Sequence, residues 1–192
     1  MTSTKTQLRR ELLTARRKVT ETVHAADSIA LTRHIFDLAA RGTVCAYVPV
    51  GSEPGSLTML DALQRTGVRI LLPVAVTGDD GTPLPLSWGE YRPGELVAAR
   101  FGLLEPAGRR LPAAALAEAG LVIVPALAVD RRGARLGRGA GFYDRSLPLR
   151  DPAARLMAVV RDDELLDEVP AEPHDVRMTD ALTPGRGVVA VG

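Results

Sequence analysis

Strands that alternate with helices along the chain predict a three-layer α/β domain, with a mainly parallel sheet and helices on both of its faces. The expected strands are short apolar runs rich in Val, Leu and Ile, which is typical of parallel strands buried on both sides. The chain has 192 residues, of which 46% are hydrophobic, so it is long enough for one domain with a substantial core. We therefore expect residues 1–192 to form a single domain.

The first expected element is a basic helix over residues 4–18. Its apolar contacts are Leu8, Leu12 and Leu13. Lys5 and Arg9 are four residues apart, so they share one face of this helix. Such a pair of cations is most often only a solvated face, and from the residues alone we favour that interpretation.

Two helices and two strands follow. The second helix covers residues 20–40, with Thr20 as a candidate cap and Gly42 as its stop. A strand over residues 43–49 comes next, then a helix over residues 57–66 that Ser56 can cap, then a strand over residues 68–74.

Glu53 lies in the loop after the first expected strand. In open α/β sheets ligands bind beyond the carboxyl ends of the strands, and this glutamate falls there. A solvated loop glutamate is the ordinary alternative, and position alone favours it.

Residues 75–112 are less regular, with turn signals at residues 78–81 and at Pro93. We expect a hairpin or a flap over a site. Trp88, the only tryptophan, lies in this segment. A lone tryptophan is more often a packing residue than a platform for a ligand, although a position in a flap gives the second interpretation somewhat more weight.

The stretch over residues 121–147 carries the strongest chemical signal. Residues 121–129 are almost wholly apolar and predict one buried strand. Three glycines then alternate with Arg138 and Ala140, so the backbone can turn sharply and present N–H groups to an anion. A helix that begins near Gly141 would point its dipole at the same place.

Asp144 follows in the first turn of that helix. A carboxylate beside an anion-binding loop is unfavourable unless a cation lies between them, and Mg²⁺ is the usual one. The loop matches neither GxGxxG nor GK[ST], and a plain tight turn between strand and helix explains its glycines equally well.

After this loop we expect a strand over residues 155–160, a short acidic helix over residues 162–168, and a final strand over residues 181–191 that PGRG interrupts. His174 and Asp175 stand before the final strand. A local cap or turn is the ordinary explanation for such a pair.

Composition limits the possible partners and compartment. The net charge is only +1, which steers the chain neither to nucleic acid nor to membranes. A single cysteine, Cys45, excludes an internal disulfide and a Cys-rich zinc site. There is no apolar leader and no run of roughly 18 apolar residues. We therefore expect a cytoplasmic monomer that binds small molecules, with an inert Cys45.

The run GARLGRGAGFYDRSL, preceded by VPALAVD, resembles the signature of the 5-formyltetrahydrofolate cyclo-ligase family, also called 5,10-methenyltetrahydrofolate synthetases. The likeness extends from Lys5 to about Pro184. It is also carried by KTQLR near the start of the chain, by YVPVGSEPGS after the first strand, and by HDV near the end.

The resemblance implies a complete site. The ATP-binding residues would be Lys5, Arg9, Arg135, Leu136, Gly137, Arg138, Gly139, Ala140, Gly141, Phe142 and Tyr143. Substrate binding would fall to Val48, Glu53 and Trp88, and metal binding to Asp144 and Asp175. The catalytic residues would be Arg138, Tyr143 and Asp144.

The chain departs from the family pattern at a few positions. Phe142 stands where the family usually has the first of two tyrosines, and Ala140 stands where it usually has glycine or lysine. Pro54 and Gly55 replace a β-branched turn after Glu53, and Thr179 replaces an aspartate that is common after HDV. None of these removes a residue with a main role. They affect the fine geometry of substrate binding more than the reaction.

The implied reaction converts 5-formyltetrahydrofolate and ATP to 5,10-methenyltetrahydrofolate, ADP and phosphate, through a phosphorylated formyl intermediate, with Mg²⁺ as cofactor. Two other classes stay open. One is another small-molecule phosphoryl-transfer enzyme with the same loop. The other is a non-catalytic nucleotide or folate binder on the same fold.

Overall fold

The computed structural model describes residues 4–38, 41–173 and 175–192. Over these ranges, eight strands form one sheet in the order β13-β12-β10-β7-β1-β2-β3-β6. Strands β12, β10, β7, β1 and β2 are parallel, whereas β13, β3 and β6 pair antiparallel with their neighbours. The strands are β1 (Thr43–Cys45), β2 (Arg69–Val74), β3 (Ser87–Glu90), β6 (Arg110–Leu111), β7 (Ala119–Pro125), β10 (Arg155–Val159), β12 (Asp180–Thr183) and β13 (Gly187–Ala190). The expected mainly parallel sheet is confirmed.

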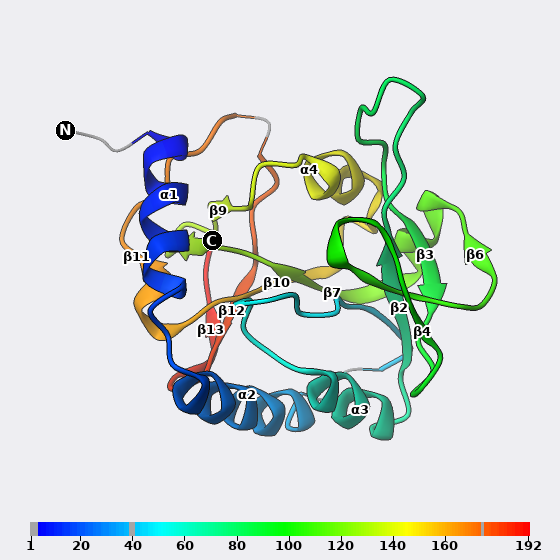
Figure 1. The fold of residues 1–192 in the computed structure, drawn as a ribbon, viewed down its shortest axis with the longest axis horizontal. Coiled ribbons are helices and arrows are strands. Elements are labelled where there is room, and N and C mark those ends of the chain that lie inside the picture. The colour runs from blue at the N-terminus through cyan, green and yellow to red at the C-terminus, as the bar shows by residue number, and fades with distance from the viewer. Residues whose placement is uncertain (1–3, 39–40, 174) are drawn as a thin grey trace.

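Helices cover both faces of the sheet (Figure 1). The helices α2 (Glu21–Phe36) and α3 (Leu57–Arg65) lie on one face, and α4 (Phe142–Ser146) lies on the other with the 3₁₀ turns η2 (Ala113–Glu118) and η3 (Leu147–Leu149). Successive strand residues point to opposite faces. Accordingly, Ile70 and Leu72 pack in the cluster of α2 and α3, and Leu71 packs in the other cluster. The result is the predicted three-layer α/β domain.

The helices begin where the sequence predicts. The side chains of Thr20 and Ser56 accept hydrogen bonds from Val23 N and Met59 N, so both act as N-caps. The expected end of the second helix, at residue 40, lies outside the described residues. None of the helices in the described ranges combines the length and the apolar character needed to cross a bilayer.

The helix α1 (Lys5–Arg16) packs on a second, small sheet in the order β11-β8-β9, seen beside it in Figure 1. These strands are β8 (Ala128–Asp130), β9 (Arg135–Leu136) and β11 (Leu165–Leu166). Leu8 and Leu12 of the helix contact a cluster that includes Leu136 and Val169. The apolar contacts predicted for Leu8 and Leu12 are therefore present, and they place α1 beside the glycine-rich stretch.

The single strand predicted over residues 121–129 is wrong, because the chain leaves the large sheet after Pro125. Leu127 N donates to Leu136 O at 2.7 Å, and β8 then pairs with β9 and β11. An unbroken apolar run carries no signal for such a change of sheet. The break matters because it creates a corner at Ala126.

Three further predictions need correction. The strand predicted over residues 43–49 shortens to β1. The acidic helix predicted over residues 162–168 is only the 3₁₀ turn η4 (Asp162–Glu164) followed by β11, because the Glu164 carboxylate folds back to accept from Arg161 N at 2.8 Å. The final strand is an antiparallel hairpin of β12 and β13.

Residues 75–112 form hairpins, as expected, partly within the large sheet and partly as a separate two-stranded sheet beside it. The strand β3 pairs with β2 and β6, and β4 (Leu96–Ala98) pairs with β5 (Leu104–Pro106) around the turn η1 (Arg100–Gly102). A tighter turn is closed by a bridge between Thr77 and Pro83. Trp88 therefore belongs to the sheet itself.

A buried ion pair fixes the end of α1. Arg16 and Glu164 have only 1% and 5% of their side chains exposed, and they pair at 2.6 Å from Nε to Oε1 and at 2.8 Å from Nη2 to Oε2. Arg16 Nη2 also donates to Ala126 O at 2.6 Å. One guanidinium thus joins α1, the corner after β7 and η4.

We predict that Glu164→Ala lowers the free energy of unfolding by about 3 kcal/mol, because it leaves the Arg16 charge buried without a partner. Urea denaturation measures this loss. Glu118→Ala removes an exposed carboxylate that pairs with Arg69 at 2.7 Å, and should cost less than about 1 kcal/mol. The double variant Arg16→Met with Glu164→Leu should recover most of the loss. Equal losses for Glu164→Ala and Glu118→Ala would contradict this account.

Candidate functional site

A cavity of about 480 Å³ lies beyond the carboxyl ends of β1, β2 and β7. Val48 and Glu53 line it after β1, Ala75 after β2, and Ala126 after β7. The glycine-rich loop over residues 137–141 and the first turn of α4 form the opposite wall. This is the edge at which open α/β sheets bind ligands.

The glycine-rich loop is sharply turned, as the sequence predicts. Gly139 and Gly141 have φ angles of 96° and 81°, a left-handed conformation that favours glycine. The helix α1 supports the loop, because Arg9 Nε donates to Gly137 O at 3.0 Å. A Cβ on Gly139 would lie at an ordinary contact distance, 3.5 Å, from the Arg9 guanidinium, so the φ angle rather than crowding favours glycine here. Arg9 therefore holds the loop from outside through the contact with Gly137 O.

Arg135 lines the cavity with only 8% of its side chain exposed. Its Nη2 donates to Asp144 Oδ1 at 2.8 Å, its Nη1 donates to Pro125 O at 3.3 Å, and its guanidinium lies 5.7 Å from the centroid of the Tyr143 ring. Burial lowers the pKa of Arg135, and the charge of Asp144 partly offsets this effect. The guanidinium is thus held in place at the inner side of the loop.

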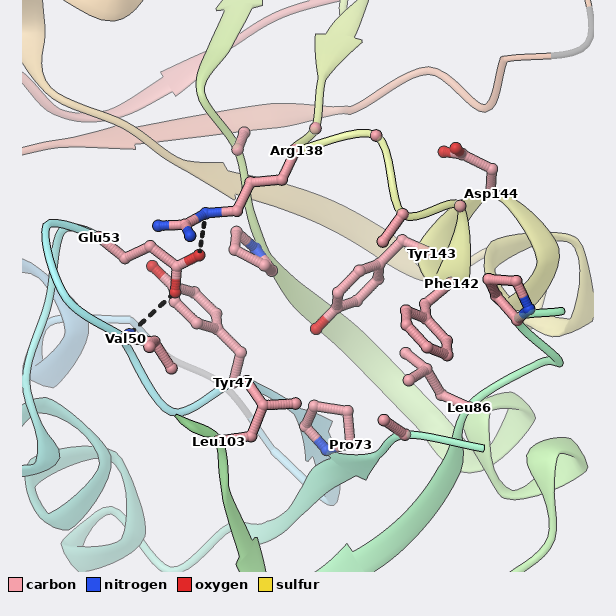
Figure 2. A pocket seen from close by; sticks show the side chains of 18 of the residues that line it. Tyr47, Val50, Glu53, Pro73, Leu86, Leu103, Arg138, Phe142, Tyr143 and Asp144 are labelled. Carbon is pink, nitrogen blue, oxygen red and sulfur yellow. Dashed lines mark hydrogen bonds and ion pairs between the residues drawn. The ribbon is translucent and has the colours of Figure 1, made fainter. Parts of the chain in front are cut away.

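Glu53 and Arg138 pair across the cavity, and Figure 2 shows the two side chains pointing toward one another. Arg138 Nε lies 3.1 Å from Glu53 Oε1, and Val50 N donates to Glu53 Oε2 at 3.0 Å. The glutamate has 10% of its side chain exposed and the arginine 47%. The carboxylate is therefore fixed by the loop after β1, whereas the arginine is free to change partner.

Tyr143 directs an unused donor into the cavity (Figure 2). Its hydroxyl is buried and has no hydrogen-bond partner among the described residues. Burial, and then the charge of Glu53, raise the pKa of Tyr143, so it stays protonated at neutral pH. The neighbouring Tyr47 differs, because its hydroxyl donates to Pro54 O at 2.8 Å.

The lower part of the cavity in Figure 2 is apolar. Pro73, Leu86, Leu103 and Phe142 line it. Phe142 offers no hydroxyl here, as its departure from the family pattern implies. Together with the Tyr143 ring, these side chains suit a flat, largely apolar group whose polar edge reaches Glu53.

Lys5 pairs with Asp175 rather than with the glycine-rich loop. Its Nζ lies 2.8 Å from Asp175 Oδ2 and 3.0 Å from Glu172 Oε1. Desolvation would lower the pKa of Lys5, but the hydrogen bonds to these two carboxylates raise it above its ordinary value. Glu172 N also donates to Asp175 Oδ2 at 2.8 Å. The neighbouring His174 lies outside the described residues.

The carboxylates predicted to bind metal lie in different surroundings. Asp144 lines the cavity and has 55% of its side chain exposed. Asp175 does not line it and has 16% exposed. Among the residues that the structure describes, no group of three or more His, Cys, Asp or Glu side chains could hold a metal ion.

The structure brings most of the predicted site residues together. Those that line the cavity are Val48, Glu53, Arg135, Gly137, Arg138, Gly139, Ala140, Gly141, Phe142, Tyr143 and Asp144. Arg9 reaches the loop from outside, and Leu136 is buried beneath α1. Lys5 and Asp175 form a separate pair.

The predicted role of Trp88 in substrate binding needs correction. Its side chain is 1% exposed, it packs in the core cluster with Leu71 and Val122, and it is not among the residues that line the cavity. The reason is that Trp88 lies in strand β3, which pairs with β2 and turns this side chain into the core. The packing interpretation of the lone tryptophan is the right one.

Thr179, another departure from the family pattern, has a structural role. Its Oγ1 accepts from Leu156 N at 2.9 Å and donates to Asp180 Oδ2 at 2.6 Å. It thus joins β10 to β12 away from the cavity.

Sequence reasoning missed Arg16 and Tyr47, which both line the cavity. Tyr47 could have been found, because both Tyr47 and Glu53 follow strand β1. Arg16 could not, because it is one of several arginines on a basic helix and its burial depends on Glu164, 148 residues away.

Comparison with known proteins identifies the family. Residues 1–184 match the model of the 5-formyltetrahydrofolate cyclo-ligase family. A 5-formyltetrahydrofolate cyclo-ligase of Mycolicibacterium smegmatis is 61% identical over 188 residues, which cover 97% of each chain. One of Escherichia coli is 30% identical over 146 residues, 75% of this chain and 79% of the relative.

A solved structure agrees in fold. The solution structure of a 5,10-methenyltetrahydrofolate synthetase from Aquifex aeolicus superposes with a TM-score of 0.78 at 24% identity, covering 97% of this chain and 92% of that one. The family model and the close relative together cover nearly the whole chain. The chain therefore belongs to the 5-formyltetrahydrofolate cyclo-ligase family.

Proposed function

We propose that residues 1–192 act as one cyclo-ligase domain that converts 5-formyltetrahydrofolate and MgATP to 5,10-methenyltetrahydrofolate, ADP and phosphate. One observation carries this proposal: a single cavity has a glycine-rich, cationic wall opposite a wall with a fixed carboxylate and apolar side chains. Two chemically different ligands can therefore meet there. Membership of the family supplies the identity of those ligands.

The cationic wall suits the phosphates of ATP. The backbone of residues 137–141 is open and tightly turned, and Arg135 and Arg138 lie beside it. Arg9 supports the loop and can shift toward an added anion. Lys5 is the next cation on the same face of α1, and we assign it to the outer phosphate. The contact with Asp175 then orients Lys5 rather than neutralising it completely.

The opposite wall suits the pterin ring. A pterin presents neighbouring N–H donors on one edge, and a carboxylate can accept both of them. Glu53 is held for this role by Val50 N, with little solvent access. Val48 lines the same part of the cavity, and Tyr143 and Phe142 provide apolar contact with the ring.

Asp144 is our candidate for the Mg²⁺ ligand. Mg²⁺ is commonly held by one or two carboxylates together with substrate phosphates, so the absence of a larger cluster among the described residues is no obstacle. Asp144 is exposed at the rim of the cavity, and Arg135 holds it from one side. When bound there, the ion would offset negative charge on the phosphates. The Asp175 carboxylate already contacts Lys5. Its role as a second metal-associated residue therefore stays a prediction from the resemblance.

The proposed reaction needs no nucleophile from the protein. The formyl oxygen attacks the γ-phosphorus and ADP leaves, then N10 attacks the activated carbon, loses its proton, and phosphate leaves with the former formyl oxygen. The residues contribute by placing the formyl oxygen in line with the γ-phosphorus and by excluding water. We assign to Arg138, which contacts Glu53 across the cavity, the stabilisation of the negative charge on the phosphoryl group during its transfer.

The direct test follows methenyltetrahydrofolate absorbance after 5-formyltetrahydrofolate and MgATP are added to the protein. We expect turnover, and we expect Asp144→Ala to reduce kcat by about a hundredfold or more. Asp167→Ala, which removes a fully exposed carboxylate, is the control and should have no effect. Binding of both ligands without turnover would favour a non-catalytic binder. Nucleotide turnover that does not depend on the folate would favour a different phosphoryl-transfer enzyme.

We further predict that Glu53→Gln raises KM for the folate by about tenfold, because the amide offers one acceptor oxygen and no charge to the pterin. KM for ATP should not rise, since Arg138 loses a competing partner. Initial rates measured with each substrate varied in turn separate the two effects, with Glu118→Gln as the exposed control. A higher KM for ATP with an unchanged KM for the folate would contradict the assignment of Glu53.

A further inference from the structure

A second hollow of about 290 Å³ adjoins the first cavity at the edge of the large sheet. Ala75 and Thr77 line both of them. The second hollow extends from there to the β4–β5 hairpin and to β6, which lie at the right of Figure 1. A ligand that leaves the first cavity past Ala75 therefore meets this hollow next.

The strand β5 separates the two spaces. Leu104 lines the first cavity and Glu105 lines the second, as expected for neighbouring residues that point to opposite sides of a strand. The chemistry changes across this strand. The near side is apolar, with Leu103 and Leu104, whereas the far side carries Arg100, Glu105 and Arg110.

Cations outnumber the anion in the second hollow. The Glu105 carboxylate is anchored by Ala75 N, which donates to Oε1 at 3.0 Å. Arg110 Nη2 lies 3.7 Å from Glu105 Oε2, a long contact, and 64% of the Arg110 side chain is exposed. A guanidinium has several N–H donors, so most of those on Arg110 remain available to a second carboxylate. Arg100 faces the same hollow.

The proposed substrate has the shape and charge for this arrangement. A folate carries its pterin at one end, an aminobenzoyl group in the middle, and a glutamate with two carboxylates at the other end. With the pterin at Glu53 and the middle along the apolar wall, the carboxylates need a cationic place beyond Leu103 and Leu104. Among the described residues that line it, the first cavity has no further cation on that side, since its arginines belong to the opposite wall and to the corner at Ala126.

We propose that this second hollow is a subsite for the carboxylate end of the substrate, with Arg100 and Arg110 as its binding residues. The inference rests on the proposed function, because it takes the folate as the ligand of the first cavity. It assigns these arginines to substrate recognition and gives them no part in the chemical step. The subsite should therefore affect KM and leave kcat unchanged.

The test compares 5-formyltetrahydrofolate with its bis-amide, in which both glutamate carboxylates are carboxamides of nearly the same shape. In the unaltered protein, the bis-amide should have a KM about tenfold higher. In the double variant Arg100→Ala/Arg110→Ala, both ligands should show this higher KM, and kcat should not change. Arg109→Ala removes one positive charge from an exposed neighbour that does not line the hollow, and it should preserve the difference.

Two results would overturn the subsite. One is an equal KM for the two ligands in the unaltered protein. The other is a double variant that raises KM for both ligands by the same factor, which would indicate a structural effect. If the double variant does not fold, Arg110→Gln replaces it, because this exposed side chain has only a long contact with Glu105. The single variant should lose part of the difference, and an undiminished difference would count against the subsite.

Failure of the subsite can be distinguished from failure of the proposed function. If the protein does not turn over 5-formyltetrahydrofolate at all, the proposed reaction is wrong, and calorimetric titration with the same two ligands still decides on the subsite. Tighter binding of the parent folate, lost in the arginine variant, would support it. Equal binding of the two ligands, or binding of neither, would overturn it.

Discussion

The buried pair of Arg16 and Glu164 is the interaction on which the site depends. Removing two charges from water is costly, and the structure compensates for this with two short contacts between the side chains and a third to Ala126 O. Arg161 extends the network, because its backbone N–H donates to Glu164 and its side chain pairs with Asp27 at 3.0 Å. These contacts bind α1 to the corner after β7, and thereby place Arg9 beside the glycine-rich loop.

The same network reaches the wall of the cavity that carries Glu53. Arg161 Nη1 donates to Ser52 O at 3.2 Å, next to Glu53. Both walls of the cavity are thus attached to one charged cluster. Between these fixed walls, the contact of Glu53 with Arg138 is the exposed and exchangeable one. In the proposed function each ligand would compete for one member of this pair, so binding of the folate would release Arg138 for the nucleotide. Coupling between the two substrates follows from this geometry.

The parts of the structure that could be predicted are those with a local cause. Three glycines in five residues specify a sharp turn wherever they lie, and Thr20 and Ser56 cap helices through neighbouring backbone groups. The parts that could not be predicted depend on distant partners. The split of the strand at Ala126 requires Arg16 and Leu136, and the burial of Trp88 requires the pairing of β3 with β2. In the site, the glycine pattern predicts the turned loop and the resemblance to the family predicts Glu53, whereas the contact of Lys5 with Asp175 spans 170 residues.

In the proposed reaction, one cavity brings the formyl oxygen of the folate into line with the γ-phosphorus of ATP. The decisive measurement labels the formyl oxygen of 5-formyltetrahydrofolate with a heavy isotope and analyses the released phosphate by mass spectrometry. We predict that the label leaves in the phosphate, at one atom for each turnover. Unlabelled phosphate formed together with methenyltetrahydrofolate would contradict it, because the formyl oxygen would then never have received the phosphoryl group.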